Sequence, residues 1–107
     1  MLGAFLAAVL VSVTIALASV GAAVLARHRA QAGADLGALA AALALPAGEA
    51  SACERARELA RAMRVSMADC VVERLDAVVT VAVPVRVAGW HIGTARAVAR
   101  AGPIEPG

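Results

Sequence analysis

The longest pattern in this sequence is an uncharged apolar run over residues 2–26, in which only three side chains carry a hydroxyl. At about 1.5 Å per residue, a helix over this run is roughly 37 Å long, which is enough to cross a hydrocarbon core of about 30 Å with some tilt. The hydroxyls of Ser12, Thr14 and Ser19 can donate to carbonyls one turn earlier and need no water. The run therefore predicts a transmembrane helix over residues 1–26.

Helical spacing continues beyond the apolar run without a break. Residues 27–45 are rich in alanine and leucine, and they predict a soluble continuation of the same helix. Pro46 and Gly48 are expected to end it, because proline lacks a backbone donor and clashes with the preceding turn. Residues 46–107 then form a separate small head. A head of this size buries little core, so we expect it to need a cross-link or a partner for stability.

Two stripes mark the long helix. Small residues recur along it at alternating spacings of four and three, a pattern that lets a neighbouring helix approach closely. The series consists of Ser12, Ala16, Ser19, Ala23, Ala26, Ala30, Gly33, Gly37, Ala40 and Ala44. We call its soluble part the helix-packing seam, which comprises Ala26, Ala30, Gly33, Gly37 and Ala40. A separate leucine ridge is expected to pack on the protein's own head: Leu36, Leu39 and Leu43.

The head begins with a second helix and continues as strands. The sequence Ser51-Ala52-Cys53-Glu54 has the capping-box form and predicts a helix from Ala52 to Arg64. A period of two then predicts strands over residues 65–73, 79–88 and 94–101, with a loop over residues 89–93. Pro84 cannot donate to a ladder, so its end of the strand should lie at an edge or a bulge. The expected fold is a membrane-anchored α+β protein with a three-stranded antiparallel sheet.

The two cysteines predict one disulfide. Cys53 and Cys70 form no CxxC motif, and no histidine is spaced to complete a zinc site with them. If the first strand runs back along the second helix, each cysteine lies roughly 16 Å from the reversal, so that the thiols meet. Closing this loop stabilises the head by roughly 3 kcal/mol. The alternative is a pair of buried free thiols in a cytosolic protein.

Composition argues against several function classes. All ten basic residues are arginines, the net charge is only +2, and the chain has one Trp, one Phe and no Tyr, so nucleic-acid binding has no support. His28 and His91 lie far apart with no nucleophile beside them, and we expect no catalytic, cofactor or metal site and no small-molecule substrate. Trp90 and His91 are candidates for an exposed contact in the glycine-bounded loop. Alternatively, Trp90 caps the small core.

Residues 27–42, RHRAQAGADLGALAAA, resemble the segment that follows the membrane helix in TadE and TadG-like proteins of Flp (tight adherence) pilus-assembly systems. The similarity is carried by a basic pair, a glutamine and an Ala-Asp-x-x-Ala-Leu-Ala-Ala-like run. Its residues are Arg27, Arg29, Gln31, Asp35 and Leu39. The later segments GEASACERARELA and TARAVARAGP are similar to small TadE-like proteins encoded in a helicase and secretion neighbourhood of actinobacteria.

This resemblance implies a pilin-like architecture and an accessory, minor-pilin-like membrane protein of a Tad-type pilus or secretion system. Its partners would be the lipid bilayer and other Tad/Flp subunits, contacted through helix packing. Pilin-like proteins of these systems commonly carry a glutamate five residues after a glycine at the start of the apolar run. Gly3 is followed by Ala-Phe-Leu-Ala-Ala instead. The departure favours an accessory subunit over a filament stem.

Orientation is set by opposing signals. Arg27, His28 and Arg29 flank the span on its C-terminal side and favour a cytoplasmic head by the positive-inside rule. The disulfide and the resemblance favour an extracytoplasmic head, which is the orientation we expect for this single-pass cell-membrane protein. Two alternatives remain at this point. One is a binding module secreted after signal-peptide cleavage at Ala16-Leu17-Ala18, and the other is a cytoplasm-facing membrane regulator.

Overall fold

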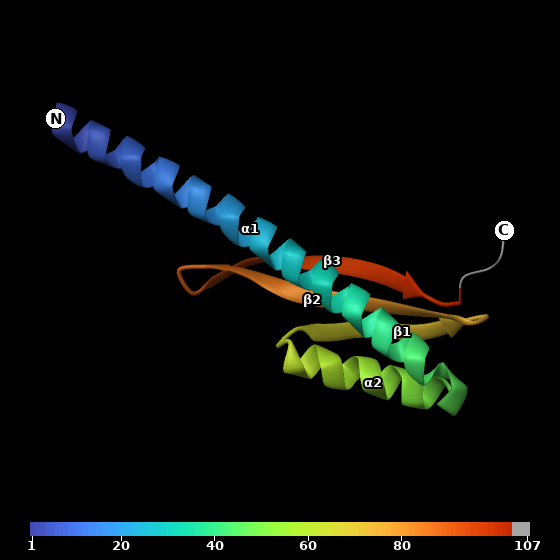
Figure 1. The fold of residues 1–107 in the computed structure, drawn as a ribbon. Coiled ribbons are helices and arrows are strands. Elements are labelled where there is room, and N and C mark those ends of the chain that lie inside the picture. The colour runs from blue at the N-terminus through green and yellow to red at the C-terminus, as the bar shows by residue number, and fades with distance from the viewer. Residues whose placement is uncertain (104–107) are drawn as a thin grey trace.

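The computed structural model describes residues 1–103 as two helices and one antiparallel sheet (Figure 1). Helix α1 spans Leu2–Ala44, a 3-10 turn follows at Leu45–Ala47, and helix α2 spans Glu49–Ala62. The strands are β1 (Ser66–Glu73), β2 (Asp76–Val87) and β3 (Trp90–Ala101), in the order β1-β2-β3. The predicted fold, a membrane-anchored α+β protein with a small antiparallel sheet, is confirmed.

The first half of α1 protrudes from the rest of the protein (Figure 1). Its most apolar stretch has a mean hydropathy of 2.4 and buries none of its surface in the protein, as expected of a helix surrounded by lipid. The Ser12, Thr14 and Ser19 hydroxyls donate to carbonyls four residues earlier at 2.8 to 2.9 Å. The polar groups of this stretch are thus satisfied within the helix itself.

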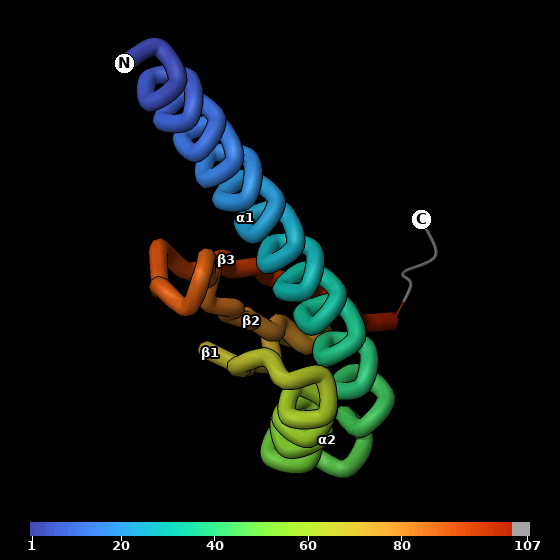
Figure 2. The backbone as a smooth tube through the Cα atoms, turned by 90° about the vertical axis from the view of Figure 1, so that its left-hand side faces the viewer, coloured from blue at the N-terminus to red at the C-terminus, as the bar shows by residue number. Residues whose placement is uncertain are grey.

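The second half of α1 lies across one face of the sheet, and α2 packs beside it over β1 (Figure 2). The core between these elements contains ten buried alanines and five buried valines. Small side chains on the helices let the helix axes approach the sheet closely, so the largest fully buried side chains between them are valines. The core is therefore thin, and it depends on close fit more than on large side chains.

Strand β2 is the centre of the sheet and supplies four of the five buried valines of the core. Val79, Val81 and Val83 are at most 2% exposed and face the helices, while Ala99, Ala97 and Ala95 stand opposite them on β3. Pairing with β1 extends along β2 only as far as Ala82. Pro84 therefore lies where β2 has become an edge on that side, as its missing donor predicts.

Two predicted boundaries are wrong. Helix α2 begins at Glu49, with Gly48 as its N-cap and no side-chain cap, so Ser51 lies inside the helix instead of capping it. The expected loop over residues 89–93 is mostly strand, because β2 and β3 are joined by a two-residue turn of Ala88 and Gly89. Both turn residues have positive φ, 51° and 84°, as a type I′ hairpin requires.

Candidate functional site

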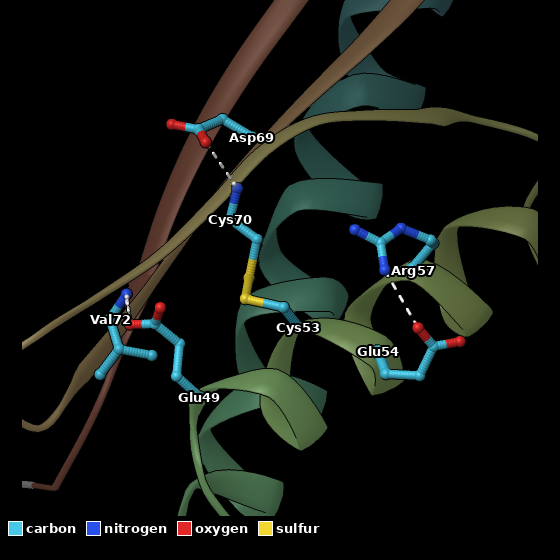
Figure 3. The surroundings of a disulfide bond; sticks show 7 residues. All are labelled: Glu49, Cys53, Glu54, Arg57, Asp69, Cys70 and Val72. Carbon is cyan, nitrogen blue, oxygen red and sulfur yellow. Dashed lines mark hydrogen bonds and ion pairs between the residues drawn. A yellow bond between two sulfur atoms is a disulfide. The ribbon is translucent and has the colours of Figure 1, made fainter.

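The disulfide joins the first turns of α2 to the middle of β1 (Figure 3). The Cα atoms of Cys53 and Cys70 lie 5.8 Å apart, which confirms the predicted pairing. Beside it, the Val72 amide donates to the Glu49 carboxylate at 3.3 Å, across the same two elements. A covalent bond and a hydrogen bond thus fasten the start of α2 to the sheet edge.

Arg29 fastens the other end of α2. Its guanidinium donates to the carbonyls of Met63 and Arg64 at 3.3 and 3.1 Å, where α2 ends. Arg64 there has a φ of 59°, and the Val65 amide returns to the Ala60 carbonyl, as in a Schellman cap. A cation at this point complements both the free carbonyls and the negative end of the helix dipole. This contact carries no sequence signature, because its partners are backbone atoms 34 and 35 residues away.

Other residues of the TadE-like segment lie on the exposed side of α1. The Gln31 amide donates to the Asp35 carboxylate at 2.9 Å, one turn along the helix. Arg27 and Leu39 are exposed. In the TadE-like segment, Arg29 therefore contacts the head, whereas Arg27, Gln31, Asp35 and Leu39 are exposed on the surface.

The helix-packing seam is used differently from the prediction. Ala26, Ala30, Gly33 and Gly37 are buried against the protein's own sheet and α2, and Ala40 is half-buried. A Cβ added at Gly33 would lie 3.0 Å from Val65 Cγ2, and one added at Gly37 would lie 3.3 Å from Val79 Cγ1. The soluble part of the small-residue series is thus already occupied within the chain and is not free for a neighbouring subunit.

The leucine ridge corrects a second expectation. Leu36, Leu39 and Leu43 are 46%, 52% and 77% exposed, so they do not pack on the head as predicted. Glycine and alanine face the valines of β2 because they allow a shorter distance between helix and sheet. The larger leucines then point away from the head. They leave an apolar stripe along the soluble half of α1, on a helix that already has a bare apolar first half.

The Trp90 and His91 pair lies at the tip of the β2–β3 hairpin. Trp90 is 77% exposed and therefore does not cap the core. His91 is exposed and its Nε2 lies 3.4 Å from Thr94 Oγ1. Ile92, which sequence analysis did not single out, is 52% exposed beside them. The hairpin tip thus carries two large apolar side chains in solvent, although contact with a partner stays a prediction.

Charged groups elsewhere form small surface networks. Arg100 on β3 donates to Asp76 at 3.0 Å and to Glu73 at 2.6 Å, and these hydrogen bonds, that to Asp76 first, raise the pKa of the guanidinium above its ordinary value. Arg57 pairs with Glu54 on α2 at 3.0 Å. Within residues 1–103, no group of three or more His, Cys, Asp or Glu side chains is arranged to hold a metal ion. Large exposed apolar side chains lie mainly along α1 and at the hairpin tip.

Residues 1–44 match the Tad family model, which describes Flp pilus-assembly TadE/G-like proteins. The matched range is α1, including the segment from which the resemblance was read. No curated protein and no solved structure shows a significant match to this chain. The TadE-like resemblance is confirmed, and it rests on the long helix.

Proposed function

Because residues 1–44 match the TadE/G-like Flp pilus-assembly family model, we propose that the chain is an accessory, minor-pilin-like membrane protein of a Tad/Flp-type pilus or secretion system. The family is one of assembly components, which accords with a role in contact and positioning rather than in catalysis. The observation that carries the proposal is the division of α1. One face of its second half holds the head, while its entire first half and its leucine ridge are uncovered.

We assign the membrane span to residues 1–26, the soluble stem to residues 27–45 and an extracytoplasmic head to residues 46–107. The disulfide between Cys53 and Cys70 supports the extracytoplasmic orientation, because such bonds persist in oxidising compartments and are rare in the cytosol. The arginines that flank the span count toward the opposite orientation by the positive-inside rule. The disulfide carries more weight, since the rule here rests on two arginines only.

The contact with other subunits is made by the uncovered surface of α1. In the span, Ser12 and Ala16 are exposed and belong to the small-residue series, which allows a second transmembrane helix to approach closely. In the stem, the leucine ridge offers an apolar stripe to the corresponding helix of another Tad/Flp subunit. At about 100° per residue, Ala16 and Leu36 lie about 160° apart around α1, so the two surfaces face different directions and suit two different partner helices.

Co-purification tests this assignment. The test variant replaces three leucines by serine: Leu36, Leu39 and Leu43. We expect the detergent-solubilised variant to lose the other Tad/Flp subunits. The protein should remain in the membrane fraction with its head folded, since these side chains do not enter the core. Val98→Ser is the matched control, because Val98 is 60% exposed on the other face of the sheet. Retention of the same subunits by the triple variant would refute packing through the stem.

Thiol labelling of intact cells tests the orientation. After mild reduction, Cys53 and Cys70 should react with a membrane-impermeant maleimide, whereas without reduction neither should. Labelling that requires lysis of the cells, together with free thiols, would instead establish a cytoplasm-facing regulator. A mature mass beginning at Ser19 in the culture fluid would establish the secreted binding module and would exclude an anchored subunit.

A further inference from the structure

We propose that the β2–β3 hairpin is a second membrane contact. Trp90 and Ile92 enter the bilayer interface beside α1, and nearby arginines bind anionic phospholipid headgroups. We call these residues the arginine ring: Arg27, Arg29, Arg64, Arg86 and Arg96. The inference rests on the proposed insertion of α1 in the membrane. The hairpin contact is a lipid-binding surface on the head, in addition to the membrane-spanning part of α1.

The direction of β2 brings the hairpin toward the membrane. Val79 lies beside Gly37 and Val81 beside Gly33, so β2 advances toward the N-terminus of α1 by about one helical turn for every two strand residues. Farther along, Val83 and Val85 line hollows with α1 residues 22–29. The two remaining strand residues and the turn continue in this direction by about 10 Å. The hairpin tip therefore lies level with about residues 16–19 of α1, and Figures 1 and 2 show the hairpin reaching back toward the N-terminal half of α1 while standing off from it.

This placement shortens the part of the assigned span, residues 1–26, that lies in hydrocarbon. A hydrocarbon boundary at residue 26 would submerge Arg86, where a guanidinium is costly, whereas Arg96 pairs with Ala82 and lies farther from the membrane. If the hydrocarbon core ends near residue 21, the span from Leu2 to Gly21 is about 30 Å long and still matches the core thickness. The turn of the hairpin then lies at the edge of the hydrocarbon core, Arg86 lies in the headgroup layer beside α1 residues 22–26, and Arg96 lies on the outer side of that layer.

The exposed side chains at the tip suit that layer. Trp90 is 77% exposed and Ile92 is 52% exposed, so both present apolar surface that the fold does not cover. Tryptophan is enriched at membrane interfaces, where its ring contacts acyl chains and its N–H contacts polar groups. A rigid two-residue turn holds both side chains beside a helix that enters the same bilayer.

The arginines supply the complementary charge. Arg27 and Arg96 line one hollow beside α1, and Arg29, Arg64 and Arg86 line the other. Neither hollow has a carboxylate among its lining residues, and within residues 1–103 none of the five forms an ion pair. Guanidinium groups bind phosphate oxygens in bidentate fashion, and clustered basic residues near a membrane surface favour anionic lipids.

Trp90 is the chain's single tryptophan, so its fluorescence reports on the hairpin alone. The full-length protein is reconstituted in vesicles of phosphatidylcholine and phosphatidylglycerol that carry a spin label at the headgroup, near the carbonyl or deep in the acyl chain. We expect most of the Trp90 emission to be lost with the two shallow labels and little with the deep one. Aqueous iodide should quench it weakly.

The matched control moves the probe to the far end of β2. In a Trp90→Phe, Leu75→Trp variant the indole lies at the β1–β2 turn, where Leu75 is 66% exposed. Its emission should be quenched by iodide and not by lipid labels. Equal lipid quenching at both positions would show that the whole head lies on the membrane, and iodide quenching at both would show that the hairpin stays in water. Either result overturns the proposal.

Charge variants test the arginine ring separately. Arg86→Gln with Arg96→Gln should reduce shallow-label quenching of Trp90 in vesicles containing phosphatidylglycerol and leave it unchanged in pure phosphatidylcholine. The control pair Arg55→Gln and Arg57→Gln removes the same charge from α2 and should change neither. Equal effects of the two pairs would refute specific headgroup binding. Flotation of each sample with the vesicles tests insertion of α1: failure to float refutes the anchor, whereas flotation with a water-exposed Trp90 refutes the hairpin contact only.

Discussion

Replacement of Gly33 by leucine should detach the head from α1. A Cβ at this position would lie 3.0 Å from Val65 Cγ2 and 3.4 Å from Val81 Cγ1, and Val81 is completely buried. A leucine adds three further carbons in a space that the two valines already fill. Overpacking of this kind costs about 3 kcal/mol, while removal of a helical glycine returns about 1 kcal/mol, so we expect a net loss of about 2 kcal/mol.

Amide hydrogen exchange of β2 in detergent micelles measures this loss. A change of about 2 kcal/mol raises the exchange-competent population about 30-fold, and the effect should be largest at the amides of the central strand. Gly21→Leu is the matched control, since a Cβ at Gly21 meets nothing within 4 Å. Its only expected effect is the small gain in helix propensity.

Unchanged exchange in the Gly33→Leu protein would refute the packing of this seam on the head. If the same variant also failed to co-purify with other Tad/Flp subunits, the seam would face a neighbouring subunit's helix, as the sequence pattern alone suggests. Reduced protection with retained co-purification is the result we expect, because it separates the face of α1 that holds the head from the faces that remain free.

Three further changes test the contacts that hold the head. Cys53→Ser with Cys70→Ser should lower its stability by about 3 kcal/mol, measured by urea denaturation, because the bond closes a loop over a separation of 17 residues. Arg29→Ala should cost about 1 kcal/mol and increase exchange at the last amides of α2, whereas loss of protection across the whole sheet would contradict a local capping role. Val81→Ala should cost about 2 kcal/mol through the cavity it leaves, and exposed Val98→Ala should stay within about 0.5 kcal/mol.

The elements with strong periodicity could be predicted from the sequence. The apolar run and its continuation predicted α1 to within a residue of its end, because no breaker occurs before Pro46. The alternation of valine predicted the buried face of β2, and the two cysteines predicted the disulfide. In each case local periodicity or the spacing of residues along the chain was sufficient, and tertiary packing did not alter the predicted element or bond.

The packing face of α1 could not be predicted in the same way. Small residues permit close approach to any partner, and the sequence does not say whether that partner is another helix or the valines of β2. From the sequence, the separate leucine ridge is the stripe expected to pack on the head. Here Gly33 and Gly37 bring the helix so close to the sheet that only small side chains fit, and Leu39 is left outside.

The turn between β2 and β3 was missed for a different reason. Type I′ turns favour asparagine or aspartate before glycine, and Ala88 is an unusual residue at a φ of 51°. The segment around Trp90 therefore looked like a longer loop bounded by Gly89 and Gly93. Its true geometry, with strand pairing up to Trp90, gives the tip a fixed direction that a loop would not have.

The unbroken course of α1 has a mechanical consequence. Its 43 residues contain no proline between lipid and sheet, and the head is clamped to it by the Gly33 contact and by Arg29. The molecule has no hinge at the membrane surface, so a partner that tilts or rotates the head must tilt or rotate the span by the same angle. In the subunit proposed above, the thickness and order of the bilayer would therefore resist any displacement that assembly imposes on the head.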